Sequence, residues 1–306
     1  MKKLPVVLIG IAVALAVAIG VWHIGDSLQK AKTEKAAIEK QREVWRVLKK
    51  SLDGKVARFR GVAGIVIEDL KTRERIVYNN DTLFPSASIV KIPIMGACFK
   101  AVKEGRVKLT DTVVLRASQR APGSGKLKYS PAGSMITIQE LMRRMVCESD
   151  NTAANILIGM LGFDYLNAAF KEFGLKNTNL SRKMMDFQCR SSGIENYTTP
   201  DDMARILEAI YEKRFLDPSI SGQCLAILKM QKIKDRIPAK LPATTVVAHK
   251  TGLERSVCHD VGIVFTAKGD LLICMLTKGV NGSRLSKDFI SLTVKEAYDR
   301  YCAAAS

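Results

Sequence analysis

Residues 261–277 read VGIVFTAKGDLLICMLT. Two runs rich in Val, Ile and Leu flank Lys268-Gly269-Asp270, a polar segment typical of a turn between two strands. We therefore predict an antiparallel pair at 261–267 and 271–277, with a further strand at 246–249 before it. The sheet of this protein is built around that pair.

The other strands that the sequence predicts lie near the opposite end of the chain. Residues 61–70 and 75–78 are rich in Val and Ile and are separated by a polar turn, which indicates a hairpin. The middle of the chain is helical instead, with a capping box from Thr137 to Glu140 and a Thr199-Pro200 helix start. A closing helix is expected at 286–302.

Strands at both ends with helices between them predict an α/β (α+β) fold. We expect one antiparallel sheet assembled from both termini, with helices on both faces and a helical lobe beside it. The chain has 306 residues, of which 47% are hydrophobic and 25% charged, so a sizeable core is feasible.

Residues 4–24 are almost unbroken Val, Ile, Leu, Ala and Gly, a run of about 20 residues that matches one bilayer crossing. We predict a transmembrane anchor or signal-anchor at 1–24; the alternative is a secretory signal cleaved after Ala16-Val17-Ala18. The basic residues that follow the span argue against export by the positive-inside rule, but long domains translocate largely regardless of such charge. We place the bulk of the chain outside the membrane, in the periplasm or the extracellular space.

Residues 25–42 are rich in Lys, Glu, Gln and Ala and predict a charged helical stalk, followed by a folded domain at 43–306. The apolar sevenfold spacing of Ala31, Ile38, Trp45 and Leu52 has mostly polar partner positions. A stalk that runs into a docked first helix is therefore favoured over a dimeric coiled coil, and we expect a monomer.

The formal charge of +18 suits an anionic neighbourhood such as a membrane surface or an acidic wall polymer. No zinc-finger spacing or aromatic RNA-binding string accompanies it, so a nucleic-acid partner is not expected. The seven cysteines include no C-x-x-C pair and the chain has three histidines, so neither a metal site nor another cofactor is predicted. An odd number of cysteines leaves at least one thiol free or paired between chains in an exported protein.

Three short strings carry chemistry: Ser88-Ile89-Val90-Lys91, Ser149-Asp150-Asn151 and Lys250-Thr251-Gly252. Together they supply a hydroxyl nucleophile, two amines, a second hydroxyl and a carboxamide, the groups needed for acyl transfer through a covalent acyl-enzyme. A single string means little, because the stalk contains a second Ser-x-x-Lys at Ser27 and Lys30.

The spacing of Ser88 and Lys91 puts both side chains on one face of a helix predicted over 89–99. The helix N-terminus favours negative charge at the serine oxygen. To act as a base, Lys91 needs a lowered pKa, which we expect from burial and from Lys250 as a second cation nearby.

The other two strings suggest supporting roles. Ser149 can relay a proton to a leaving nitrogen, and Asn151 can orient a substrate amide, while Asp150 is more suited to a helix cap. Lys250 and Thr251 can hold a substrate carboxylate.

From about residue 43 to 306 the chain resembles the class A β-lactamases, of the penicillin-recognising serine enzyme superfamily that also contains D,D-peptidases. The matching stretches are Phe84-Pro85-Ser86-Ala87-Ser88-Ile89-Val90-Lys91, Gly123-Ser124-Gly125, Ser149-Asp150-Asn151-Thr152-Ala153-Ala154-Asn155, Thr198-Thr199-Pro200, His249-Lys250-Thr251-Gly252 and His259-Asp260-Val261-Gly262. The resemblance implies that Ser88 is the acylated nucleophile, that Lys91 takes part in its activation, and that the N–H groups of Ser88 and Leu253 form the oxyanion hole. It also implies a β-lactam or a peptidoglycan peptide as substrate.

One loop departs from the family pattern. The deacylating glutamate of the family lies in a string like Arg-x-Glu-x-x-x-Asn, and here the string that begins at Arg182 has Met184 at that position. Asp186 is the nearest carboxylate and our predicted substitute, one methylene shorter; Glu195 lies much further along. Without a positioned base, deacylation slows by about a hundredfold or more.

Three functions remain open at this point. A membrane-anchored β-lactamase-type hydrolase that works through Ser88 ranks first, and a D,D-peptidase acting on cell-wall stem peptides ranks second. The third is a penicillin-binding sensor that acylates once, although residues 1–3 leave almost no cytoplasmic output domain.

Overall fold

The structure of this protein, a computed structural model, describes residues 4–303. The α-helices are α1 (Leu4–Arg58), α2 (Lys91–Lys103), α3 (Ile138–Cys147), α4 (Asn151–Leu161), α5 (Phe163–Glu172), α6 (Phe187–Ser191), α7 (Pro200–Tyr211), α8 (Pro218–Lys229) and α9 (Arg284–Ala303). The strands are β1 (Val62–Asp69), β2 (Arg75–Tyr78), β3 (Phe84–Pro85), β4 (Thr112–Val114), β5 (Met135–Thr137), β6 (Tyr197–Thr198), β7 (Val247–Glu254), β8 (Val257–Val264) and β9 (Leu271–Lys278). Short 3-10 turns are η1 (Ala87–Val90), η2 (Ala117–Gln119), η3 (Leu127–Tyr129) and η4 (Ile237–Lys240).

A five-stranded antiparallel sheet lies at the centre, in the order β2-β1-β9-β8-β7. The first long strand pairs along its whole length with the last one, from Val62 opposite Lys278 to Asp69 opposite Leu271. The prediction that both ends of the domain build one sheet is therefore confirmed. Strand β7 lies at the edge of this sheet.

The predicted bounds of the last strands were partly wrong. Strand β7 does not end at residue 249 but continues to Glu254, and β8 begins at Val257 rather than at residue 261. Ser256 closes the connection between them with a left-handed backbone (φ 59°), so the turn lacks the glycine that would have marked it. Both strands are also buried on both faces, which removes the alternation that identifies a strand.

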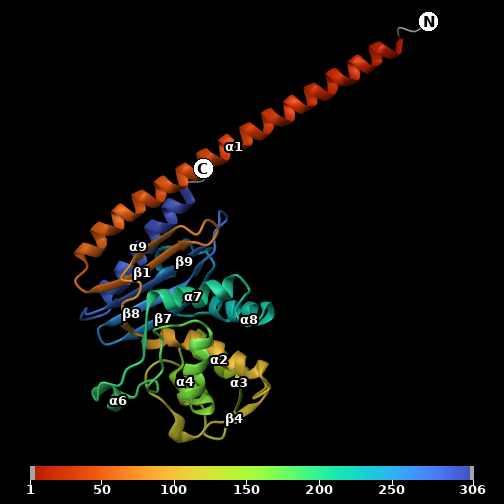
Figure 1. The fold of residues 1–306 in the computed structure, drawn as a ribbon. Coiled ribbons are helices and arrows are strands. Elements are labelled where there is room, and N and C mark those ends of the chain that lie inside the picture. The colour runs from red at the N-terminus through yellow and green to blue at the C-terminus, as the bar shows by residue number, and fades with distance from the viewer. Residues whose placement is uncertain (1–3, 304–306) are drawn as a thin grey trace.

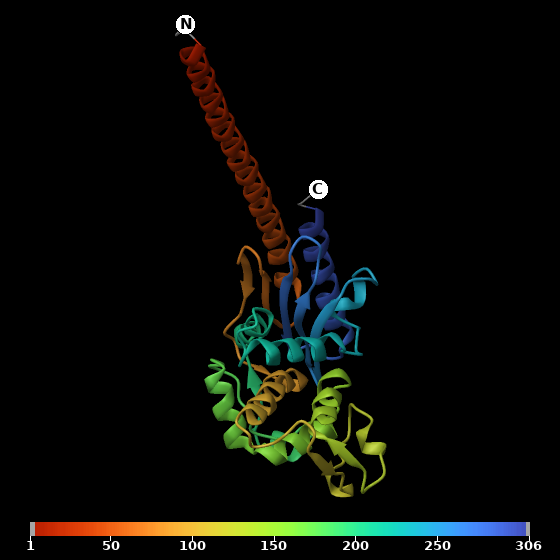
Figure 2. The same cartoon turned by 90° about the vertical axis from the view of Figure 1, so that its right-hand side faces the viewer.

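Helices cover both faces of the sheet, as predicted (Figure 1). On one face α1 and α9 bury an apolar layer that includes Trp45, Leu52, Ile65 and Val294. On the other face α7 and α8 lie against the sheet, and the helices α2 to α5 form the lobe beyond them (Figure 2). One large apolar cluster joins that face to the lobe, with Ile92, Met95 and Phe170 fully buried in it.

Helices α3 and α7 begin at the caps that the sequence indicated. Thr137 Oγ1 accepts the N–H of Glu140 at 3.1 Å at the start of α3, and Thr199 Oγ1 accepts that of Asp202 at 3.1 Å at the start of α7. Each bond satisfies a backbone donor that the first helical turn leaves without a partner. The helix expected over 89–99 consists of η1 followed by α2.

Helix α1 is one continuous rod that extends from the domain, and its C-terminal part packs against α9 (Figure 1). Trp45, Leu48 and Leu52 are buried there, so the prediction of a docked first helix is confirmed. The anchor predicted at 1–24 falls largely outside the residues whose side chains are described. Among the residues whose side chains are described, no single helix has the length and apolarity to cross a membrane; α4 and α5 pass together by composition but meet at a 91° bend.

Candidate active site

Ser88 lies in η1, between the short strand β3 and helix α2. The residue before it, Ala87, has a left-handed backbone (φ 44°), an uncommon conformation that turns the chain sharply at the nucleophile. Strand β7 passes close to Ala87. If Gly252 carried a Cβ atom, that atom would lie only 3.3 Å from the Cβ of Ala87. Within residues 4–303 the half-buried Ser88 hydroxyl has no hydrogen-bond partner, which leaves it available to a substrate.

Lys91 is completely buried at the start of α2. Its Nζ donates to the carbonyl oxygen of Ser149 at 2.7 Å, to Ser149 Oγ at 3.3 Å and to Asn151 Oδ1 at 2.8 Å. Burial lowers the pKa of Lys91 to about 7, even though the carboxylates of Asp150 and Glu254 act in the opposite direction. A substantial fraction of this amine is therefore neutral near pH 7, as a base requires.

Ser149 stands between the two lysines. Its hydroxyl accepts from Lys250 Nζ at 3.0 Å and from Lys91 Nζ at 3.3 Å, and its backbone is left-handed (φ 56°). The structure thus places one hydroxyl between two buried amines, the geometry of a proton relay.

We expected burial and the charge of Lys250 to lower the pKa of Lys91, and burial is the largest cause. The pKa of Lys250 is the one that is lowered by its neighbour, first by burial and then by the positive charge of Lys91. Both side chains are completely buried, and the loss of hydration is the largest cause of the lowered pKa at each of them.

Asp150 has a structural role, whereas Asn151 is placed to contact a substrate. Asp150 Oδ1 caps α4 by accepting the N–H of Ala153 at 2.9 Å, and Oδ2 accepts that of Leu127 at 2.8 Å, which confirms the predicted cap. Asn151 Nδ2 donates to the carbonyl oxygen of Pro122 at 2.9 Å. Because an amide nitrogen carries two protons, one donor of Asn151 remains for a substrate.

Lys250, Thr251 and Leu253 follow one another along the edge strand β7. Lys250 Nζ also donates to the carbonyl oxygen of Thr251 at 2.7 Å, which fixes the amine in place. In the described part of the chain the Thr251 side chain has no hydrogen-bond partner. The predicted clamp therefore presents an orientated amine and an available hydroxyl, and the backbone of Leu253 lies two residues further along the same strand.

Two residues of strand β8 support the site without a role assigned to them from the sequence. His259 Nε2 lies 2.8 Å from the carbonyl oxygen of Pro85, and its Nδ1 accepts the N–H of Thr277 at 3.1 Å. Burial lowers the pKa of His259 to about 4, so the ring is neutral and its Nε2 donates to Pro85. Asp260 accepts from His249 Nδ1 at 2.9 Å and from the Ile237 N–H at 2.9 Å.

The His259 contact helps to position the nucleophile, because Pro85 lies three residues before Ser88. The Asp260 contact holds His249, the residue before Lys250. The string His259-Asp260 was the signal available in the sequence, but only the fold shows what the two side chains hold.

The sequence model described as the beta-lactamase enzyme family matches residues 46–301, which is most of the chain. The protein belongs to the beta-lactamase enzyme family. It is a serine β-lactamase-type hydrolase, in agreement with the resemblance seen in the sequence.

Named relatives of this family cover nearly the same length. Beta-lactamase VEB-1 of Pseudomonas aeruginosa is 24% identical over 257 residues, which is 78% of this chain and 85% of VEB-1. The crystal structure of a beta-lactamase from Sphaerobacter thermophilus superposes with a TM-score of 0.78 at 32% identity, covering 85% of this chain and 97% of the other. The structure of PBP-A gives a TM-score of 0.77 at 30% identity, covering 84% and 96%. A mutant of PBP-A was solved as an acyl-enzyme complex with penicillin G, with a TM-score of 0.77 at 28% identity, covering 86% and 97%.

Hydrogen bonds between Arg182 and Asn196 hold together the two ends of the loop that departs from the family pattern. Asn196 Oδ1 accepts the N–H groups of Ser181 and Arg182, and its Nδ2 donates to the Arg182 carbonyl oxygen at 3.0 Å. The buried guanidinium of Arg182 contacts Glu195 at 2.7 Å and Glu254 at 3.1 Å. Glu254 ends strand β7, so these ion pairs tie the loop directly to the strand that carries Lys250.

Met184 occupies the loop position where the family has its glutamate, and its side chain is 6% exposed and packs in the large apolar cluster. Asn155 clamps its backbone, since Oδ1 accepts the Met184 N–H at 2.8 Å and Nδ2 donates to the Met184 carbonyl oxygen at 3.0 Å. The position is thus firmly held but carries no titratable group.

Asp186 has another task in this structure. Its Oδ1 accepts the N–H of Cys189 at 3.0 Å and caps the short helix α6. This bond lowers the pKa of Asp186, which weakens it as a proton acceptor. No hydrogen bond in residues 4–303 joins Asp186 to Ser88, so its predicted catalytic role stays a prediction.

The described residues contain no group of three His, Cys, Asp or Glu side chains that could hold a metal ion. All seven cysteines are free thiols, and Cys98, Cys147, Cys224, Cys258 and Cys274 are buried. They behave as small core residues rather than as disulfide partners.

Proposed function

We propose that this protein opens β-lactams by forming an acyl-enzyme on Ser88. The observation that carries the proposal is the Ser149 hydroxyl held between Lys91 and Lys250, beside a serine hydroxyl without a partner. Neutral Lys91 takes the proton of Ser88, and the serine oxygen bonds to the lactam carbonyl carbon. The carbon–nitrogen bond of the ring then breaks, and Ser149 passes a proton to the leaving nitrogen.

Substrate contacts are proposed for the remaining site residues. Lys250 and Thr251 bind the substrate carboxylate, Asn151 donates to its side-chain amide, and the N–H groups of Ser88 and Leu253 stabilise the oxyanion. The site needs no residue from a second chain, which is consistent with a monomer.

Deacylation is proposed to be slow. Water must attack the ester on Ser88 while a base accepts its proton, and Met184 offers none at the family position. We propose Asp186 as a weak substitute, with its pKa lowered by the cap bond to Cys189.

A D,D-peptidase is the second candidate, and the burial of Met184 favours it. A peptidase transfers the acyl group of its peptide substrate to water or to an amine. Its function therefore does not require fast hydrolysis of a penicillin adduct. The substrate would be the terminal D-alanyl peptide of a cell-wall stem.

One time course separates these functions. Residues 43–306 are mixed with penicillin G, and the intact mass is recorded from milliseconds to hours. We expect an adduct of the full penicillin mass that forms quickly and decays slowly, with release of the hydrolysed ring. Absence of both an adduct and hydrolysed penicillin contradicts the proposal, and hydrolysis without an adduct contradicts slow deacylation. Release of D-alanine from a stem peptide at a higher rate than penicillin hydrolysis favours the second candidate.

We also propose that residues 1–24 anchor the chain in a membrane, with the catalytic domain periplasmic or extracellular. The apolar run at 4–24 supports this. Recovery of the full chain from the soluble fraction of lysed cells, without cleavage at the N-terminus, would contradict it.

A further inference from the structure

A hollow of about 570 Å³ lies beside helix α4, apart from the groups that perform acylation. Strand β4, the segment that follows it and the loop containing Lys183 surround it. The residues that line it are Thr112, Val113, Val114, Arg116, Ser118, Gln119, Arg120, Ala121, Asn155, Ile156, Gly159, Met160 and Lys183. Its volume is that of a small-molecule site.

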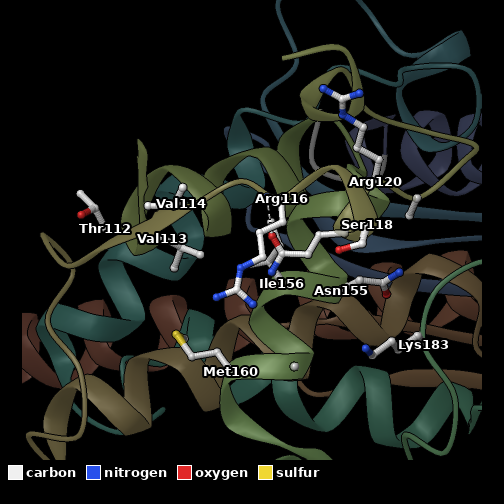
Figure 3. A pocket seen from close by; sticks show the side chains of 13 residues that line it. Thr112, Val113, Val114, Arg116, Ser118, Arg120, Asn155, Ile156, Met160 and Lys183 are labelled. Carbon is white, nitrogen blue, oxygen red and sulfur yellow. Dashed lines mark hydrogen bonds between the residues drawn. The ribbon is translucent and has the colours of Figure 1, made fainter. Parts of the chain in front are cut away.

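The charged side chains around this hollow are all basic: Arg116, Arg120 and Lys183. None of the three forms an ion pair with a carboxylate anywhere in residues 4–303, although the chain pairs many of its other Lys and Arg side chains. Figure 3 shows Arg116 reaching between Val113 and Met160, with Lys183 on the other side of Asn155. Unpaired cations over a concave surface raise the local concentration of anions.

The wall of the hollow beneath these cations is apolar. Val113, Ile156 and Met160 contribute it, and Gly159 adds no side chain, so helix α4 leaves space at that point. A ligand that satisfies both surfaces carries a carboxylate and an apolar body. Arg120 does donate to the carbonyl oxygen of Ser130 at 2.8 Å, but none of the three cations has an anionic partner in the described chain. A bare inorganic anion would leave the apolar wall uncovered, and a neutral apolar molecule would leave the positive charges without a negative one.

Asn155 connects this hollow to the loop of the active site. Its side chain lines the hollow, and it also accepts a hydrogen bond from the Met184 N–H and donates one to the Met184 carbonyl oxygen. Lys183 also lines the hollow and is bonded in sequence to Met184. A ligand here therefore touches two of the residues that set the position of the loop.

We propose that this hollow binds an organic carboxylate with an apolar body, and that its occupancy changes the lifetime of the acyl-enzyme through the Met184 loop. The second half of this statement rests on the proposed function of Ser88, whereas binding itself does not.

Binding is tested on the full chain labelled with ¹³C at the methionine methyl groups. Titration with 4-phenylbutyrate is expected to shift the Met160 resonance, while Met275, buried in β9, stays unchanged. The neutral alcohol 4-phenylbutanol and acetate are expected to bind about tenfold more weakly or not at all, because each lacks one of the two features. Equal binding of the alcohol, or no shift of Met160, would overturn the site.

The double variant Arg116→Gln with Lys183→Gln is expected to raise the Kd for 4-phenylbutyrate by about tenfold or more. The matched control is Arg205→Gln with Lys176→Gln, two exposed basic residues that do not line the hollow. An unchanged Kd in the first variant, or the same rise in the control, would show that net charge alone attracts the ligand and would overturn the proposal.

The effect on the loop is measured as the decay rate of the penicillin adduct with and without saturating 4-phenylbutyrate. We expect a change of about threefold or more that disappears in the Arg116/Lys183 variant. Binding without any change in decay would overturn the effector role. If Ser88 never acylates, the proposed function fails, but the Met160 titration still decides whether the site exists.

Discussion

The two halves of the active site are built on opposite principles. The acylation half consists of Lys91, Lys250 and Ser149, which are nearly or completely buried and bonded to one another. The deacylation half is a loop in which the family position is apolar and the nearest carboxylate, Asp186, serves a partly exposed helix cap.

This difference shows that removal of a side chain from water decides whether its pKa suits a general base. Burial brings the pKa of Lys91 down from its usual range to about 7 and turns an ordinary ammonium group into a base. A carboxylate needs the same burial to raise its pKa and become a base near neutral pH. Asp186 has the reverse environment, because a backbone N–H stabilises its charged form.

Removing the nucleophile is expected to have the largest effect. Ser88→Ala leaves no hydroxyl to attack the lactam, so the penicillin adduct seen by intact mass should disappear. Both variants are compared in the full chain, where the matched control is Ser27→Ala, in the other Ser-x-x-Lys string, which lies exposed on α1. An adduct that persists in Ser88→Ala, or disappears in Ser27→Ala, would place the nucleophile elsewhere.

Introducing a carboxylate at the loop position of Met184 is expected to have the second largest effect. Met184→Glu puts a carboxylate where Asn155 already clamps the backbone, and burial raises its pKa toward that of a useful base. Deacylation should accelerate by about a hundredfold, measured from the decay of the adduct.

The control for that substitution is Met184→Gln, which has the same length without a titratable group. It should fold to a similar melting temperature as Met184→Glu and leave the decay rate near that of the original protein. Equal acceleration by both variants would mean that loop mobility, rather than a general base, limits deacylation.

The acylation rate is expected to depend on pH through Lys91. Only the neutral amine accepts the serine proton, so acylation should rise with pH, reach half of its maximum at about pH 7 and level off above it. Below that pH the rate should fall about tenfold for each pH unit. Stopped-flow acylation across pH 5–9 measures this profile; a flat profile would contradict Lys91 as the base.

The smallest effect is expected at Asp186. Asp186→Asn keeps a side-chain oxygen to cap α6 but removes the carboxylate. We expect deacylation to slow by no more than about tenfold, below the contribution of a well-placed base. Acylation should not change. A decay rate identical to that of the original protein would remove Asp186 from the mechanism.

Much of the fold was predictable because local patterns agreed with the global arrangement. The Thr137 and Thr199 caps, the hairpin at the start of the domain and the pair that ends in β9 follow from composition and turn chemistry. The bounds of β7 and β8 and the turn between them were wrong, because most of both strands is buried and Ser256 closes their turn without glycine.

The sequence by itself determined which groups are available: a serine, two lysines and a second hydroxyl in the order of the family, and no glutamate in the loop. It could not determine what those groups do, since charge and pKa depend on how far each side chain is removed from water. Tertiary structure buried Lys91 and Lys250 together around Ser149, fixed Pro85 with His259, and set Asp186 to cap a helix. The physical reason is that hydration and hydrogen-bond partners come from segments far apart in the chain, which only the folded structure brings into contact.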